Sequence, residues 1–140
     1  MKKDVLIELK SVIEAHGESE SIEITTRGKL LEKDDSLFIT YKETDDNGFD
    51  GCSVLVRVDG EDKASVTRNS PAPSHLIIER GKRNVCAYNT PFTTAMLGIS
   101  SAKIRKKQQK DHLQLFISYE LDLNSELMSR NELSIKIWEL

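Results

Sequence analysis

The segment from residue 113 to residue 140 constrains the fold more than any other part of the chain. Its odd positions carry a row of large side chains: Leu113, Leu115, Ile117, Tyr119, Leu121 and Leu123. After Asn124 and Ser125 the alternation resumes at Leu133, Ile135 and Ile137. Successive side chains of a strand point to opposite faces, so the pattern predicts two strands that each bury one face. Because a lone hairpin is not stable in water, these strands must belong to a larger sheet.

Shorter alternating runs fill much of the remaining chain, at residues 22–26, 37–41, 54–58 and 64–68. Turn signals lie near positions 17, 34, 47, 60, 72, 81, 109 and 124. Gly28 within a strand pattern indicates a bulge or a sharp bend. On periodicity alone, residues 4–15 and 90–107 fit either a strand or a helix. Many short strands with short connections predict an all-β fold, a closed antiparallel up-and-down barrel of about eight to ten strands.

The chain is expected to form one domain over residues 1–140, because no repeat, low-complexity tract or linker divides it. Its apolar runs are too short to span a membrane. Asp4 and Glu8 interrupt the apolar start, so no signal peptide is predicted. Without an export signal, Cys52 and Cys86 are expected to be reduced thiols packed as small hydrophobic side chains. These features predict a cytoplasmic protein that does not contact the membrane.

Two segments carry a resemblance to a known family. They read YNTPFTTAMLGISSAKI from residue 88 and LFISYELDLNSELMSRNELSIKI from residue 115. With the earlier run ITTRGKLLEKDDSLFITYKE, they resemble the YwiB-like family of small bacterial proteins. The residues most specific to the resemblance are Tyr88, Thr90, Pro91, Phe92, Tyr119, Asn131 and Leu133.

The resemblance implies a closed antiparallel barrel of the calycin type, related in shape to lipocalins and fatty-acid-binding proteins. It implies that both ambiguous segments are strands. The family has no established activity, so it assigns no catalytic or binding residue to this chain.

A barrel of this size is either packed inside or holds one small ligand. Four polar side chains fall in phase with the apolar rows: Thr26, Tyr41, Arg68 and Tyr119. Arg68 stands out, since it aligns with Ala64 and Val66 and a buried guanidinium needs partners. It can hold a carboxylate or a phosphate, with the two tyrosines as hydroxyl donors. Alternatively, Arg68 lies at the barrel rim or pairs with an internal acid. The sequence therefore predicts a protein that binds a small amphipathic or anionic ligand.

Two other functions remain open. The first is a protein-interaction module or homodimer that uses the outer surface, where Phe116, Trp138 and Leu140 fall out of phase with the inner rows. The second is weak nucleic-acid binding through the basic run at residues 103–110: Lys103, Arg105, Lys106, Lys107 and Lys110. That run contains no aromatic residue and the net charge is -3, which disfavours nucleic acid as a partner. A solvated strand end is the simpler interpretation.

Catalytic and metal sites are not expected. His16, His75 and His112 lack the close spacing of metal ligands. The acidic loop at residues 45–50 resembles a calcium loop, but Val56 occupies the position of its distal glutamate. Neither cysteine has a neighbouring histidine that would activate it. The sequence predicts no enzyme, no metal and no cofactor.

Overall fold

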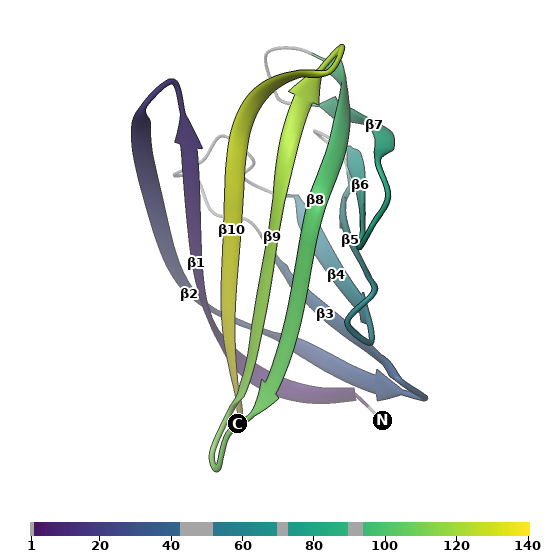
Figure 1. The fold of residues 1–140 in the computed structure, drawn as a ribbon. Coiled ribbons are helices and arrows are strands. Elements are labelled where there is room, and N and C mark those ends of the chain that lie inside the picture. Colours follow the sequence, from purple (N-terminus) through teal and green to yellow (C-terminus); the bar gives the residue numbers. More distant parts are fainter. Residues whose placement is uncertain (1, 43–51, 70–72, 90–93) are drawn as a thin grey trace.

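The computed structural model describes residues 2–42, 52–69, 73–89 and 94–140, and its regular elements in these ranges are ten β strands (Figure 1). The strands are β1 (Lys2–Ala15), β2 (Glu18–Lys33), β3 (Ser36–Lys42), β4 (Ser53–Asp59), β5 (Lys63–Arg68), β6 (Ser74–Glu79), β7 (Asn84–Asn89), β8 (Thr94–Gln108), β9 (Leu113–Leu123) and β10 (Glu126–Glu139). Both ambiguous segments are thus strands where they are described. The turn signals near residues 47 and 72, the acidic loop, and residues 90–92 of the family resemblance lie outside the described ranges.

The strands form one antiparallel sheet that curls into a nearly closed barrel. Its order is β6-β5-β4-β3-β2-β1-β10-β9-β8-β7, so chain neighbours pair and β10 pairs with β1. The two ends of the sheet meet at β6 and β7, where the Asn84 side chain donates to the Ile77 carbonyl oxygen at 3.4 Å. The predicted up-and-down barrel is confirmed, with its seam between β6 and β7 and with the two terminal strands paired inside the sheet.

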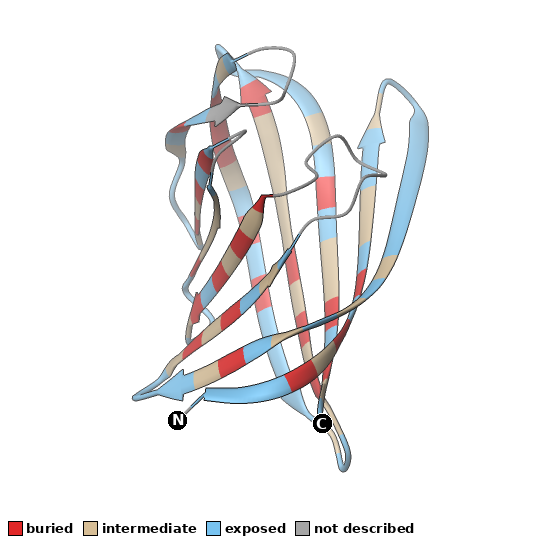
Figure 2. Cartoon of the chain, turned by 180° about the vertical axis from the view of Figure 1, so that it is seen from behind, coloured by how far each residue is buried: buried red, intermediate tan, exposed pale blue. Residues whose placement is uncertain are grey.

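The inner face is packed most densely toward the end of the barrel that carries the chain termini. Figure 2 shows buried residues alternating with exposed ones along the strands. In β1 the inward row begins with Val5, Ile7 and Leu9, all 5% exposed or less, and continues to Ile13, which is 38% exposed. The side chains of this inward row are therefore buried near the chain termini and become exposed toward the β1–β2 turn, where the barrel opens.

Two local features fix the shape of the sheet. At the β9–β10 turn, Asn124 and Ser125 both have positive φ, at 53° and 69°, as the tightest hairpin turns require. In β2, a Cβ added to Gly28 would collide with the carbonyl oxygen of Thr40 and lie 2.6 Å from Ile7 Cδ1. The register of β1 with β2 continues through Gly28 without a shift. Glycine is needed there for a close backbone approach, and the bulge that the sequence suggested is absent from this pairing.

The two cysteines are buried and free, as predicted. Cys52 is 0% exposed and Cys86 is 7% exposed, and both are part of the core. The described residues contain no helix that is long and apolar enough to cross a membrane.

Candidate functional site

A cavity of about 180 Å³ lies inside the barrel, at the end that carries the β1–β2 and β9–β10 turns (the upper end in Figure 1). Seven strands contribute to its lining. The apolar lining residues are Leu9, Ile13, Ile22, Ile24, Val66, Leu76, Leu121 and Leu133. The polar ones are Ser11, Tyr41, Arg68, Tyr119, Asn131 and Glu132. Three of the four site residues predicted from the sequence are therefore brought together.

Arg68 is the last residue of β5 and faces the interior at the mouth. It lies opposite Val54 of β4 and Ser74 of β6. Its Nη1 donates to the Ser74 hydroxyl at 3.4 Å, and Ser74 is only 7% exposed. The position at the end of a strand fits the predicted rim location, and the same position allows the guanidinium to face a ligand. A planar guanidinium suits a carboxylate or phosphate, because its N–H donors form a fixed fork.

Tyr41 and Tyr119 approach the cavity from different walls. Tyr41 of β3 lies opposite Val54, so the cross-strand row Tyr41–Val54–Arg68 places the tyrosine and the arginine two strands apart, about 10 Å between backbones. Tyr119 of β9 lies opposite Asn131 of β10. Both tyrosines are half-buried and pack against the core. The cavity therefore has one polar wall on β3 to β6 and a second on β9 and β10.

Thr26 does not line this cavity. It lies opposite Ile7, within the packed part of the barrel, and its hydroxyl donates to the Arg27 carbonyl oxygen at 3.4 Å. Thr26 shares the inward face with the other three predicted residues but lies closer to the packed end than they do.

Asn131 and Ser74 were missed as site residues. Asn131 is 7% exposed, and its Nδ2 donates to the Ser129 hydroxyl at 3.0 Å. The signal was present in the sequence, because Asn131 is in phase with Leu133 and Ile135 just as Tyr119 is in phase with Ile117. Ser74 is in phase with Leu76 in the same way. Phase therefore identifies polar side chains that point inward in a barrel strand.

The apolar part of the lining comes largely from the β1–β2 hairpin. Ile13 and Ile22 lie at the opening and are 38% and 39% exposed, while Ile24 lies deeper beside Leu9. Exposed isoleucines at a cavity mouth offer apolar surface that a ligand can cover. The site thus combines a cationic group on one wall with an aliphatic wall opposite.

An ion pair outside the cavity supports the mouth. Arg83 donates to Asp122 through Nε at 3.0 Å and through Nη2 at 2.5 Å. Asp122 also accepts the backbone N–H of Ser125 at 3.0 Å, which fixes the β9–β10 turn. The hydrogen bonds from Arg83 hold the pKa of Asp122 below its usual value, despite partial desolvation.

Metal binding has no support in the ranges that the structure describes, which contain no group of three or more His, Cys, Asp or Glu side chains that could hold an ion. The acidic residues at 45–50 lie outside those ranges. Of the three predicted outer-surface residues, Leu140 is 65% exposed, Trp138 contacts the His112 ring, and Phe116 lines a groove on the outside of the barrel.

Residues 7–135 match the family described as "Domain of unknown function (DUF1934)". This chain belongs to the DUF1934 family. It is 25% identical over 122 residues to the "Uncharacterized beta-barrel protein YwiB" of Bacillus subtilis (strain 168), which is 87% of this chain and 84% of that protein. The crystal structure of the ywiB protein from Bacillus subtilis matches with a TM-score of 0.81 at 22% identity, over 99% of this chain and 93% of the other.

These matches confirm the resemblance read from the sequence and the barrel fold. The description of the DUF1934 family and the name of its relative assign no activity. The fold alone does not determine a function.

Proposed function

We propose that the barrel binds one small amphipathic anion in its mouth cavity, with Arg68 holding the charged group. The observation that carries the proposal is the cross-strand row that brings Tyr41 and Arg68 to one wall of a cavity whose lining is mostly apolar, with Ser74 beside Arg68. Arg68 is half-buried and lines the cavity, where the fixed fork of its N–H donors suits the carboxylate or phosphate of a ligand.

The size and lining of the cavity define the ligand further. Its volume of about 180 Å³ is below the range of roughly 300–1,000 Å³ that is typical of sites for drug-sized molecules. A short aliphatic carboxylate fits this description. Its carboxylate would lie between Arg68 and the tyrosine hydroxyls, and its chain would cover Ile22, Ile24 and Leu133. Tyr119 and Asn131 would contribute hydrogen bonds from the second wall.

The proposed role is binding or carriage, as in lipocalins, with no chemical step and no cofactor. Support comes from the lining, whose described members include one acid, the exposed Glu132, and no histidine or cysteine. We propose that the protein acts in the cytoplasm, which is supported by two buried cysteines that remain free thiols.

Native mass spectrometry of protein purified gently from its own cells tests the proposal first. A discrete extra mass that is lost on denaturation supports a bound ligand. A clean mass without ligand, at the size of a dimer, would contradict it and favour the outer surface as the functional one.

A titration with a defined probe tests the anchor. Amide NMR spectra are recorded while hexanoate, and then hexanol, is added to the intact protein. Hexanoate is expected to shift resonances of cavity residues, and Arg68→Gln is expected to weaken its binding at least tenfold. Arg57→Gln is the matched control, because Arg57 lies on the outside of β4, where it contacts Phe38 and pairs with Asp59. Equal hexanoate affinity in both variants would overturn the assignment of Arg68.

A further inference from the structure

The outer surface of β8, β9 and β10 brings the basic run beside an aromatic residue that its own sequence lacks. These strands lie side by side in Figure 1. Across them, Arg105 lies opposite Phe116, and Phe116 lies opposite Ser134. One row along, Lys107 lies opposite Gln114, which lies opposite Lys136. Cross-strand neighbours on one face have Cβ atoms about 5 Å apart. We call Lys103, Arg105, Lys107, Phe116 and Lys136 the outer basic face.

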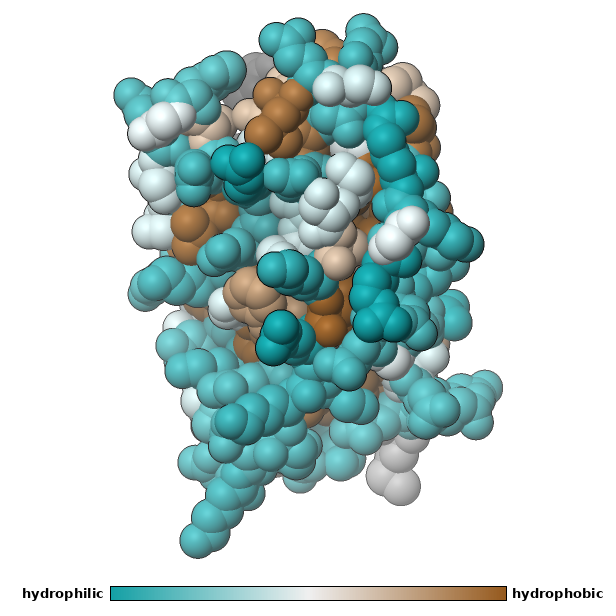
Figure 3. Space-filling model, viewed as in Figure 1, coloured by the Kyte–Doolittle hydropathy of each residue, from teal (hydrophilic) through white to brown (hydrophobic). Residues whose placement is uncertain are grey.

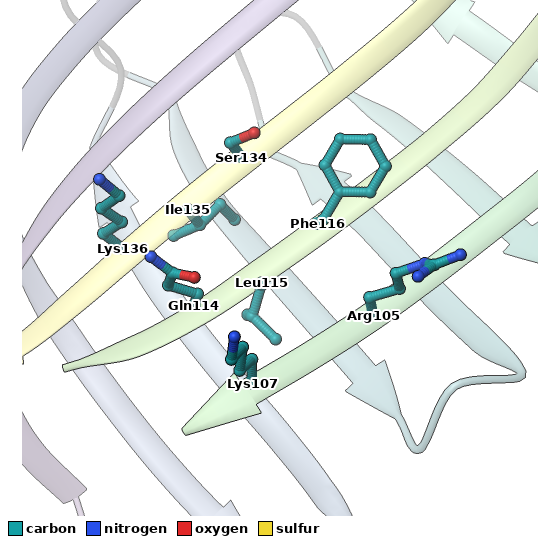
Figure 4. Close-up of a pocket in the computed structure, with 8 residues that line it drawn as sticks. All are labelled: Arg105, Lys107, Gln114, Leu115, Phe116, Ser134, Ile135 and Lys136. Carbon is teal, nitrogen blue, oxygen red and sulfur yellow. The ribbon is translucent and has the colours of Figure 1, made fainter. Parts of the chain in front are cut away.

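A groove of about 310 Å³ runs over this face. Figure 4 shows Arg105 and Lys107 reaching it from β8, Phe116 and Gln114 from β9, and Lys136 from β10. Leu115 and Ile135 also border the groove but point into the core, since they are 2% and 1% exposed. Figure 3, viewed from the same side as Figure 1, shows small apolar patches separated by hydrophilic side chains. The groove therefore offers the Phe116 ring as its outward apolar surface, with cations along its borders.

The cations of β8 are not neutralised by ion pairs within the part of the chain that the structure describes. Lys103, Arg105 and Lys107 alternate along the strand, are exposed, and have no carboxylate within 4.0 Å among the described residues. At the Lys103 end of the face, Arg130 does pair, with Glu120 at 3.0 Å. Acids border the face at Glu132 and Glu8, on β10 and β1. Positive charge nevertheless predominates in the groove, so an anionic partner would complement it.

We propose that the outer basic face binds a short segment of single-stranded nucleic acid. Phosphates would contact Arg105, Lys107 and Lys136, and one base would stack on Phe116. Proteins that bind single strands without sequence preference combine a positively charged groove with an aromatic side chain that stacks a base. A duplex keeps its bases stacked on one another, so Phe116 favours a single strand. The face is separate from the mouth cavity, because it uses the outward side chains of strands whose inward side chains form the core.

The net charge of -3 does not oppose this proposal, since local potential is set by the groove and not by the sum over the chain. The lack of an aromatic residue within the basic run does not oppose nucleic-acid binding either. Phe116 comes from the neighbouring strand, and the pairing register places it against Arg105.

The test measures fluorescence anisotropy of labelled RNA and DNA of about 12 nucleotides with the full chain, at about 20 mM salt. Binding is expected, and its affinity is expected to fall with salt with a log–log slope near -2, as about three phosphate contacts on a single strand predict. The double variant Arg105→Glu/Lys107→Glu is expected to bind the oligonucleotides at least tenfold more weakly than the wild type. The control variant is Lys33→Glu/Lys63→Glu, on β2 and β5, which also lowers the net charge by four, from -3 to -7. Its affinity for the oligonucleotides is expected to fall much less.

Stacking is tested at Phe116. Phe116→Leu keeps an apolar side chain and is expected to weaken binding roughly tenfold, while Phe116→Tyr keeps a ring and is expected to bind as the wild type does. Circular dichroism checks that each variant is folded. No binding at low salt, equal losses in both charge variants, or equal affinity for duplex would each overturn the proposal. Tighter binding of polyglutamate than of the oligonucleotides would also overturn it, in favour of an acidic protein partner.

Discussion

Arg83 reaches across Gly98 to form a two-point ion pair with Asp122. A Cβ at Gly98 would lie 2.6 Å from the Arg83 guanidinium carbon, so the side chain rests directly on the glycine. Gly98 is on β8 and Asp122 is opposite it on β9, whereas Arg83 immediately precedes β7. The pair therefore fastens the start of the seam-side strand β7 to β9, across β8. Through the Ser125 amide it also fixes a turn at the mouth of the cavity.

This pair predicts a specific dependence of stability on pH. Arg83 lowers the pKa of folded Asp122, and the Ser125 amide adds to the effect. A carboxyl whose folded pKa is lower than its unfolded pKa stabilises the fold above the unfolded value, near pH 4, and loses that contribution as pH falls through the folded value. Asp122→Asn should therefore lower the Tm at pH 7, and the difference from wild type should shrink below about pH 4.

Thermal unfolding followed by circular dichroism between pH 2 and pH 7 measures this. Asp35→Asn, in the exposed β2–β3 turn, is the control for removing one carboxylate, and its effect on the Tm at pH 7 should be smaller than that of Asp122→Asn. A deficit for Asp122→Asn that is constant across the whole range would contradict the ion-pair explanation.

Gly28 should tolerate no side chain. In Gly28→Ala the added methyl group must displace the Thr40 carbonyl or the Ile7 side chain, and Ile7 is 0% exposed. We expect a loss of about 3 kcal/mol in the free energy of unfolding, as for other overpacked sites. Urea denaturation measures it. Thr26→Ala on the same strand should cost less than about 1 kcal/mol, because its side chain is half-exposed and makes only a local hydrogen bond. Similar losses in the two variants would show that the close approach at Gly28 does not limit the strand.

Truncating a side chain to alanine should cost more stability at the packed end of the barrel than at the mouth. Ile7→Ala removes a side chain from the dry core and should cost about 4 kcal/mol. Ile24→Ala, at the cavity wall, should cost about 1 kcal/mol, because Ile24 is already partly exposed and borders open space. Urea denaturation again provides the measurement. Equal costs would mean that the mouth is packed as tightly as the opposite end.

Alternation predicted which face each side chain takes, and the structure confirms it for most of β9 and β10. Leu115, Ile117 and Ile135 are all buried, and Arg68 and Tyr119 reach the cavity. The prediction is wrong at the end of β9, where Leu123 is 42% exposed and Asp122, under Arg83, is 7% exposed. Alternation could not predict how far along the barrel axis a residue lies. Thr26 has the right phase, but it lies opposite Ile7 in the packed half of the barrel. The position of a residue along the axis depends on the register between strands.

The position of the seam and the neighbour of Arg105 on the outer face depend on pairing between distant segments, which the sequence did not predict. The seam lies between β6 and β7 because β1 pairs with β10, beginning with Val5 opposite Glu139. The neighbour of Arg105 on the outer face is Phe116, which comes from the next strand. Neither relationship follows from the periodicity of one strand, since both depend on how distant segments align.

Trp138 should distinguish the two proposed sites, since it is the single tryptophan of the chain. Its ring lies against His112, tilted by 31° with centroids 5.1 Å apart, and it follows Lys136 by two positions, on the same outer face of β10. An oligonucleotide on the outer basic face should therefore quench the emission of Trp138. Hexanoate in the mouth cavity should leave it unchanged, because the cavity lies on the inner side at the other end of the barrel. Fluorescence titrations of wild type, Arg68→Gln and Arg105→Glu/Lys107→Glu make the comparison. Each variant should lose the response to one probe only, and loss of both responses in either variant would contradict the independence of the two sites.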